Sequence, residues 1–199
     1  MRISIVGSGT VGRALAIGLA EAGHDVAVGT RDGSRPQAAE VAASLPGSAR
    51  LTGYRDAVED GDLVFMAVPG SLVVEVAEQI GTDAFAGKVV VDLTNPAVVD
   101  ESGVRSAFGE DDSAAEALQR ALPGAHVVKA FNQIEAGVIT SPAPDEKRPL
   151  RIAGDDAASK AVVAGLGESL GWKIRDLGPL SRSRALERGF IDWLASQQR

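Results

Sequence analysis

A glycine-rich turn between a predicted strand and a predicted helix constrains this chain more than any other feature. Residues 2–6 (RISIV) form a short apolar run, and GSGTVG follows directly at 7–12. The next eight residues carry apolar side chains at helical spacing. In such a dinucleotide-binding unit Gly7 permits the tight turn, Gly9 lets the backbone approach a pyrophosphate, and Gly12 lets the helix pack on its strand. A Gly-x-Gly-x-x-Gly match is weak by itself, but its flanks supply the context that the motif requires.

The end of the second predicted strand, residues 25–29, indicates which dinucleotide binds. NAD-binding folds usually carry an Asp or Glu at this point to hold the ribose 2′-hydroxyl. This chain instead has Thr30, Arg31 and Asp32, with Arg35 close behind. A guanidinium matches a phosphate in shape and charge, so we predict a 2′-phosphate pocket and NADP(H) rather than NAD. In the alternative interpretation both arginines are solvated loop charges and Asp32 turns toward the ribose.

Beyond this unit, predicted strands and helices alternate along the chain. Strands are predicted at 49–53, 62–68, 88–92, 126–132, 150–154 (an edge strand) and 172–177. Helices are predicted at 36–45, 54–59, 72–80, 113–122, 155–170 and 181–196. The remainder is predicted as polar loops at 100–103 and 109–112, a helix or lid at 133–139, and a Pro-rich surface loop at 141–149. The alternation predicts an α/β fold with a doubly wound, mainly parallel sheet.

Two units are expected along this sheet. Residues 1–140 form the predicted NADP-binding domain, and residues 150–199 form a small strand-helix-strand-helix extension packed on the same sheet. Ligands of such sheets bind at the carboxyl ends of the strands. Residues at the ends of the strands predicted at 62–68, 88–92 and 126–132 are therefore predicted to line the cofactor. The proline turns after the first two of these strands also serve simply to end them. The full predicted cofactor-binding set is Gly7, Ser8, Gly9, Thr10, Val11, Gly12, Thr30, Arg31, Arg35, Ala67, Val68, Pro69, Asn95, Pro96, Ala130 and Asn132.

Composition narrows the range of partners and locations. The net charge of -7 argues against nucleic acid or an anionic membrane surface as a partner. No stretch approaches the roughly 20 apolar residues of a membrane span, and the chain begins in a strand with no signal-peptide pattern, so a cytoplasmic location is expected. With no cysteine, a thiolate metal site and a cysteine nucleophile are excluded. The acidic residues at 100–112 lack metal-ligand spacing, so no metal is predicted.

Two further motifs carry a family resemblance, namely KAFN at 129–132 and GPLS at 178–181. With the glycine turn, they make the chain similar over nearly its whole length to the NADPH-dependent coenzyme F420 reductases, also called F420-dependent NADP oxidoreductases. The resemblance implies a single Rossmann domain with a small C-terminal extension. It also implies hydride transfer between NADP(H) and a deazaflavin, coenzyme F420, with the extension shaping the deazaflavin pocket. In that family, the positions of the glycine turn, of Thr30-Arg31 with Arg35, and of Val68-Pro69 hold the pyrophosphate, the 2′-phosphate and the nicotinamide side.

The KAFN segment departs from the archaeal members of this family, which carry a histidine-containing segment there. It resembles another branch, which includes the cytosolic domain of six-transmembrane metalloreductases that pass electrons from NADPH to a flavin. FMN or FAD as the second redox partner, and hence an NADPH-dependent flavin or ferric reductase, is therefore an alternative.

No catalytic residue is predicted. Hydride transfer between two stacked flat rings needs orientation rather than an acid or a base. His24 and His126 fall away from the predicted ligand edge, and Lys129 is interpreted as a charge at a strand end rather than as a proton donor. Asn132 is a candidate for orienting the second ring.

A protein that binds NADP(H) without being an enzyme, as a sensor, is the competing hypothesis from another class. It differs in needing no second pocket, so the discriminating feature is whether the ledge between Pro69, Asn95, Asn132 and Gly178 is large enough for a tricyclic ring. The apolar helix at 181–196 belongs either to the core or to a dimer contact, and a homodimer is expected.

Overall fold

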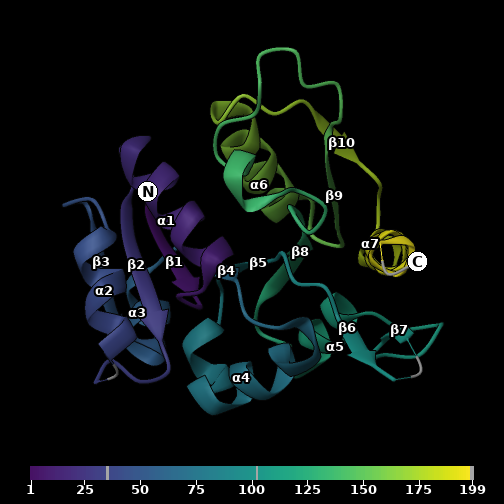
Figure 1. Ribbon diagram of the computed structural model, residues 1–199, viewed down its shortest axis with the longest axis horizontal. Coiled ribbons are helices and arrows are strands. Elements are labelled where there is room, and N and C mark those ends of the chain that lie inside the picture. Colours follow the sequence, from purple (N-terminus) through teal and green to yellow (C-terminus); the bar gives the residue numbers. More distant parts are fainter. Residues whose placement is uncertain (35, 102, 198–199) are drawn as a thin grey trace.

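Within residues 1–34, 36–101 and 103–197, which the computed structural model describes, eight strands form one sheet in the order β10-β9-β8-β5-β4-β1-β2-β3 (Figure 1). Neighbouring strands are parallel except β8 and β9, which pair antiparallel. The sheet is thus mainly parallel, as predicted. The strands are β1 (Arg2–Val6), β2 (Asp25–Thr30), β3 (Ala49–Gly53), β4 (Leu63–Met66), β5 (Val89–Asp92), β8 (His126–Lys129), β9 (Leu150–Gly154) and β10 (Ile174–Asp176).

Helices cover both faces of the sheet because successive strand side chains point to opposite sides. Ile3 and Ile5 pack with α1 and α6 on one face, whereas Val6 packs with α3, α4 and α5 on the other. This is the doubly wound α/β fold that the sequence predicts. The helices are α1 (Thr10–Glu21), α2 (Pro36–Ser44), α3 (Tyr54–Asp60), α4 (Val73–Ile80), α5 (Ala114–Ala121), α6 (Ala157–Ser169) and α7 (Ser183–Ser196), with short 3₁₀ turns η1 (Gly70–Leu72), η2 (Thr82–Phe85), η3 (Ala136–Val138) and η4 (Leu180–Arg182).

The order of the strands reverses between β1 and β4. From β1 the chain proceeds to β2 and β3 on one side, and from β4 to β5 and β8 on the other. Crossover connections therefore leave the two central strands in opposite directions, which opens a crevice at their carboxyl ends. The loops after β1, β2 and β4 meet at this edge, and those after β5 and β8 continue it toward α7, at the opposite end of the sheet from α2 and α3 (Figure 1).

Helices α5 and α6 both begin at side-chain caps that the sequence predicts. The Ser113 hydroxyl oxygen accepts the backbone N–H of Glu116 at 3.1 Å and donates its own proton to the Glu116 carboxylate at 2.7 Å. At α6, Asp156 accepts the backbone N–H of Ser159 at 2.7 Å. Each cap satisfies a donor that the first helical turn leaves free.

One element was missed and one expectation was wrong. A two-stranded antiparallel ribbon, β6 (Ala97–Asp100) with β7 (Gly103–Ser106), flanks the loop predicted at 100–103, and no strand was predicted on either side of that loop. Its exposed position leaves no strong apolar alternation, and Val99 is 55% exposed. The strand at 150–154 is not an edge strand, because β10 pairs with β9 on its outer side. Both β9 and β10 extend the same sheet, while the division into units 1–140 and 150–199 stays a prediction.

The other differences are small. Residues 133–139 contain only the single turn η3 in place of the predicted helix or lid. The helix predicted at 72–80 is preceded by the turn η1. None of the helices in the described part of the chain is long and apolar enough to cross a membrane.

Candidate cofactor and acceptor site

The three glycines of the turn differ in what surrounds them. Gly7 has φ +121°, and a Cβ there would collide with the Ala67 carbonyl oxygen. A Cβ at Gly12 would collide with the carbonyl oxygen of Gly7, whereas one at Gly9 would meet nothing within 4 Å. Two of the glycines therefore allow the turn and the helix to form, and the third leaves an open face of backbone at the N-terminus of α1. This is the arrangement in which a pyrophosphate approaches the helix.

A groove of about 340 Å³ runs along this face. It brings together the ends of β1, β2 and β4, which are far apart in sequence, and the Ser8 and Thr30 hydroxyls lie 3.4 Å apart within it. Arg31 is exposed at its rim and has no hydrogen-bond or ion-pair partner among the described residues. Arg35 lies outside the described residues. The lining residues are Gly7, Ser8, Gly9, Thr30, Arg31, Asp32, Ala38, Val41, Tyr54, Ala67, Val68 and Pro69.

A second, larger groove of about 650 Å³ begins on the other side of the first turn of α1. Its volume falls within the range of small-molecule sites. Val11, next to the glycine turn, contributes to one side, and Phe190 and Trp193 of α7 contribute an aromatic wall with ring centroids 5.6 Å apart. The lining residues are Val11, Leu93, Asn95, Phe131, Asn132, Gln133, Ile134, Glu135, Ala136, Arg148, Arg151, Gly189, Phe190 and Trp193.

The predicted ledge is only partly realised. Asn95 and Asn132 line the second groove, Pro69 lines the first, and Gly178 lines neither. Pro96 and Ala130 are buried and line neither groove.

A close approach of two loops fixes the strand ends. A Cβ at Gly70 would overlap the backbone of Asn95 and Pro96, so this glycine lets the loop after β4 lie against the loop after β5.

Thr10 and Gly12 belong to the first turn of α1.

Asn95 and Asn132 form a reciprocal clasp between the ends of β5 and β8. The Asn132 side-chain amide donates to Asn95 Oδ1 at 2.9 Å, and the Asn95 amide donates to the Asn132 carbonyl at 2.7 Å. Between Lys129 and this clasp, Phe131 adopts φ 62°, an unusual left-handed conformation for a residue with a side chain. Its buried ring packs on Phe65 with the centroids 6.0 Å apart. Packing and the clasp thus hold a strained turn at the groove, as at many functional sites.

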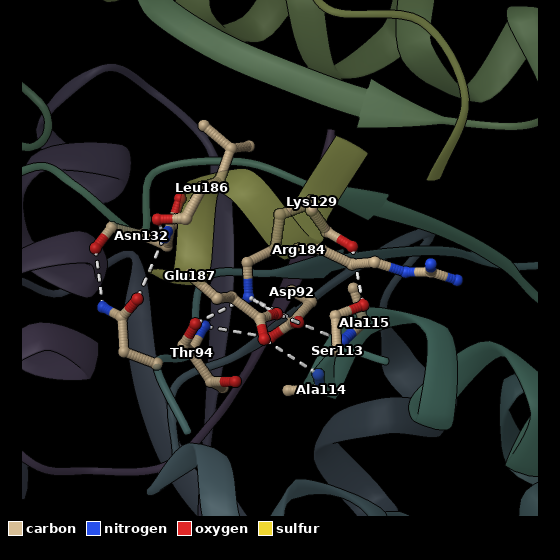
Figure 2. A network of polar contacts seen from close by, with 12 residues as sticks. Asp92, Thr94, Ser113, Ala114, Ala115, Lys129, Asn132, Arg184, Leu186 and Glu187 are labelled. Atoms are coloured by element: carbon tan, nitrogen blue, oxygen red, sulfur yellow. Dashed lines mark hydrogen bonds and ion pairs between the residues drawn. The ribbon is translucent and has the colours of Figure 1, made fainter. Parts of the chain in front are cut away.

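Lys129 is the last residue of β8 and carries a charge, as the sequence suggests, but this charge is buried and paired. Its side chain is 0% exposed, and its ammonium donates to Asp92 Oδ2 at 2.9 Å, to the Thr94 carbonyl at 2.6 Å and to Glu187 Oε1 at 2.6 Å (Figure 2). Glu187 also accepts the backbone N–H groups of Ala114 at 3.0 Å and of the following residue at 3.4 Å. The burial and pairing were not predicted, because the partner carboxylate of α7 lies 58 residues away in the chain.

The electrostatics keep this ammonium charged. Burial lowers the pKa of Lys129, but the carboxylates of Asp92 and Glu187 more than offset that effect and raise it above the usual lysine value. Burial raises the pKa of the Glu187 carboxyl, although Lys129 opposes this shift. All three protons of the ammonium are engaged in hydrogen bonds, so Lys129 has none to offer a substrate.

Comparison with known proteins places the chain in a family. The family described as NADP oxidoreductase, coenzyme F420-dependent, matches residues 2–96. A crystal structure from Arthrobacter sp. FB24, of a protein provisionally named an F420-dependent NADP reductase, is 33% identical, has a TM-score of 0.89, and is matched over 96% of this chain and 90% of that chain. This chain belongs to the F420-dependent NADP oxidoreductase family. The resemblance that the sequence carries is thus confirmed, while the KAFN branch within the family stays a prediction.

Two further relatives show how far the similarity extends. The F420-dependent NADP reductase of Methanocaldococcus jannaschii is 27% identical over 94% of this chain and 88% of that protein. The metalloreductase STEAP3 of Rattus norvegicus is 32% identical over 94% of this chain, but the chain spans only 36% of that protein's length. The predicted enzyme class, an NADP-dependent oxidoreductase, and the predicted cofactors, NADP(H) and coenzyme F420, are those of the family.

Sequence reasoning missed most of the second groove. The aromatic residues of α7 were noticed, but were assigned to the core or to a dimer contact because periodicity does not tell a groove wall from either. Arg148, Arg151 and Gln133 carried no motif. The conformation of Phe131 left no trace in the sequence.

Proposed function

We propose that this protein transfers a hydride between NADP(H), held along the glycine turn, and the deazaflavin coenzyme F420, held in the second groove. The observation that carries the proposal is that two grooves adjoin at the first turn of α1, with Gly9 bordering one and Val11 the other. A protein that only senses NADP(H) needs the first groove alone. The second groove therefore favours a reaction between two ligands.

The first groove fits NADP(H). The empty space at the position of a Gly9 side chain and the free N–H groups of α1 suit a pyrophosphate. The Arg31 guanidinium, which has no partner among the described residues, suits a 2′-phosphate. We assign residues 7–12, 30–31 and 67–69 to this cofactor, with Arg35 as a predicted second phosphate ligand. Pro96 and Ala130 support the strand ends rather than line a groove, so their predicted cofactor contact has less support than the others.

The second groove fits a flat ring. Its Phe190 and Trp193 wall offers aromatic surface, and Asn95 and Asn132, whose side chains form the clasp, also line it. Bound NADPH supplies the hydride. The residues of the chain contribute orientation, holding the two rings at a near-attack distance of about 3–3.5 Å, and they contribute no acid or base. We therefore assign no catalytic residue.

The remaining proposals concern organisation. We propose that residues 1–140 hold NADP(H) and that residues 150–199, through Arg151 and α7, shape the acceptor groove. The homodimer and the cytoplasmic location stay predictions. The 32% identity to a metalloreductase keeps FMN or FAD as an alternative acceptor, although the chain spans only 36% of that protein.

Stopped-flow absorbance with NADPH and, separately, oxidised F420, FMN and FAD tests the proposal. We expect fast bleaching of the deazaflavin band, and slower or no bleaching of the two flavins. The Gly9→Val variant is the control, because loss of NADPH binding should abolish every signal. Faster bleaching of FMN or FAD would show that a flavin, and not F420, is the acceptor. No turnover despite tight NADPH binding would show that the protein is a sensor and not an enzyme.

A further inference from the structure

Polar contacts join the first turns of α7 to the start of α5 and to the loop after β8. The Ser183 and Ser113 hydroxyls lie 2.7 Å apart, and the Arg184 guanidinium donates twice to Glu116, at 2.8 and 2.7 Å. The carbonyl of Leu186 accepts from the side-chain amides that follow β8, those of residues 132 and 133, at 3.2 and 2.8 Å. Together with the contacts of Glu187, which Figure 2 shows, these contacts hold residues 183–187 in place.

The next turns of α7 contribute residues to the wall of the second groove. Gly189, Phe190 and Trp193 line it, and a Cβ at Gly189 would come within 3.1 Å of Gln133 Nε2, so the helix lies close against the loop after β8. Trp193 itself is 54% exposed. The position of this aromatic wall is therefore set mainly by the fastened turn that precedes it.

Lys129 occupies the centre of the fastening. Its ammonium joins the end of β5, through Asp92 and the Thr94 carbonyl, to α7, through Glu187. Asp92 and Lys129 lie at the ends of β5 and β8, and each stands three positions before a residue that lines the second groove. Asp92 precedes Asn95, and Lys129 precedes Asn132. One buried cation thus fixes the origins of both loops and of the helix that together border the second groove.

Stability alone gives a weak reason for such a cation. Removing an ammonium and two carboxylates from water is costly, and apolar side chains of similar volume often stabilise a fold equally well. Directed hydrogen bonds do fix the relative placement of the groups that they join. We propose that Lys129 and Glu187 are a positioning pair that sets the acceptor groove, by seating α7 so that Phe190 and Trp193 face the ring. This inference rests on the proposed function, because it assigns the groove to the electron acceptor.

The test compares Glu187→Gln with wild type. Both oxygens of Glu187 face donors, namely Lys129 and the N–H groups at the start of α5, whereas a glutamine offers a single acceptor. We expect the KM for the acceptor to rise at least tenfold, with the Kd for NADPH unchanged within twofold. The matched control is Asp83→Asn, which removes the carboxylate of an exposed pair with Arg55 and should change neither constant. A parallel rise in both constants, or an unchanged KM, would overturn the proposal.

Lys129→Met, in which two buried carboxylates lose their ammonium, is the more severe variant and is at risk of unfolding. A second readout therefore follows α7 directly, through Trp193 emission in a Trp172→Phe background. There Glu187→Gln should change the emission maximum and raise quenching by acrylamide, with the far-ultraviolet circular dichroism unchanged. Unaltered emission and quenching would show that Lys129 and Glu187 do not hold α7 in position, and would contradict the inference. This readout needs no acceptor, so it separates failure of the positioning pair from failure of the proposed reaction.

Discussion

The two grooves are adjacent but are built in opposite ways. The glycine-turn groove is lined by residues 7–69 at the ends of β1, β2 and β4, and Arg31 at its rim has no ion-pair partner among the described residues. The second groove gathers side chains from Val11 to Trp193, and behind it lies a fully buried ion pair. A site that recognises phosphates through N–H groups depends on the conformation of the backbone. A site that orients a ring depends on side-chain walls that tertiary contacts hold in position. The following predictions test this contrast, from the largest effect to the smallest.

Within the glycine turn, two substitutions should separate folding from binding. Gly12→Val should prevent stable folding, because its side chain would collide with the Gly7 carbonyl. Gly9→Val should leave the fold intact, since nothing lies within 4 Å of a Cβ there, and should abolish NADPH binding. Circular dichroism and fluorescence titration measure the two effects. Retained NADPH binding by Gly9→Val would remove the turn from the site.

Behind the second groove, Lys129→Met should lower the free energy of unfolding by about 3–5 kcal/mol, because it leaves buried carboxylates without their ammonium. Urea denaturation measures the change. The comparison is Arg2→Met, which removes an exposed pair with Asp62 and should cost far less. Equal costs for the two variants would mean that the buried pair is not distinct from a surface pair.

At the rim of the first groove, Arg31→Ala should weaken NADPH binding by about 10–100-fold, the effect of losing a charge-assisted hydrogen bond to a phosphate. NADH binding should change little, because NADH lacks the 2′-phosphate. Isothermal titration with both nucleotides measures the ratio. Equal losses for the two would show that NADP(H) preference does not come from Arg31.

At the strained turn, Phe131→Gly should be more stable than Phe131→Ala by about 1 kcal/mol, although glycine is ordinarily the worse replacement. Both variants lose the packing on Phe65, but only glycine adopts φ 62° without strain. Thermal unfolding of the two proteins gives the difference. A more stable alanine variant would show that the turn carries no strain.

The smallest effects concern pH, and they should have opposite signs at two carboxyls, Glu116 on α5 and Glu187 on α7. The hydrogen bond from Arg184 lowers the pKa of Glu116 below its ordinary value of 4.5, so this stabilisation is present above 4.5 and is lost as the pH falls through the lowered pKa. Burial raises the pKa of Glu187 above 4.5, so the native state loses stability as the pH rises from 4.5 through the raised pKa.

The cost of Glu116→Gln should therefore grow as the pH rises toward 4.5, and that of Glu187→Gln should shrink as the pH rises beyond it. Urea midpoints measured across this range test the signs. The same trend for both variants would contradict the assignment.

The features that the sequence predicted are those with a local physical cause. Gly7 and Gly12 are required by the turn itself, and Ser113 by the free N–H groups of the helix that it caps. Alternation of strands and helices sufficed for the doubly wound sheet, because each apolar run must be covered on both faces.

The features that it did not predict depend on partners distant in sequence. Lys129 has the same appearance in the chain whether it is solvated or paired, and only α7 decides the matter. The strand at 150–154 became interior because β10 pairs with it. The ribbon β6–β7 is stabilised by its own pairing more than by burial, so periodicity gave no signal. Folded geometry, rather than residue pattern, defines the second groove.

The span of 58 residues between Lys129 and Glu187 also bears on how the chain is made. During synthesis Lys129 leaves the ribosome well before its second carboxylate, and N-terminal parts of a chain generally begin to fold first. In that interval Asp92 is available to it and Glu187 is not, so the ammonium has only one of its two carboxylate partners. A nascent chain paused before α7 emerges would therefore expose a charge that the finished protein buries.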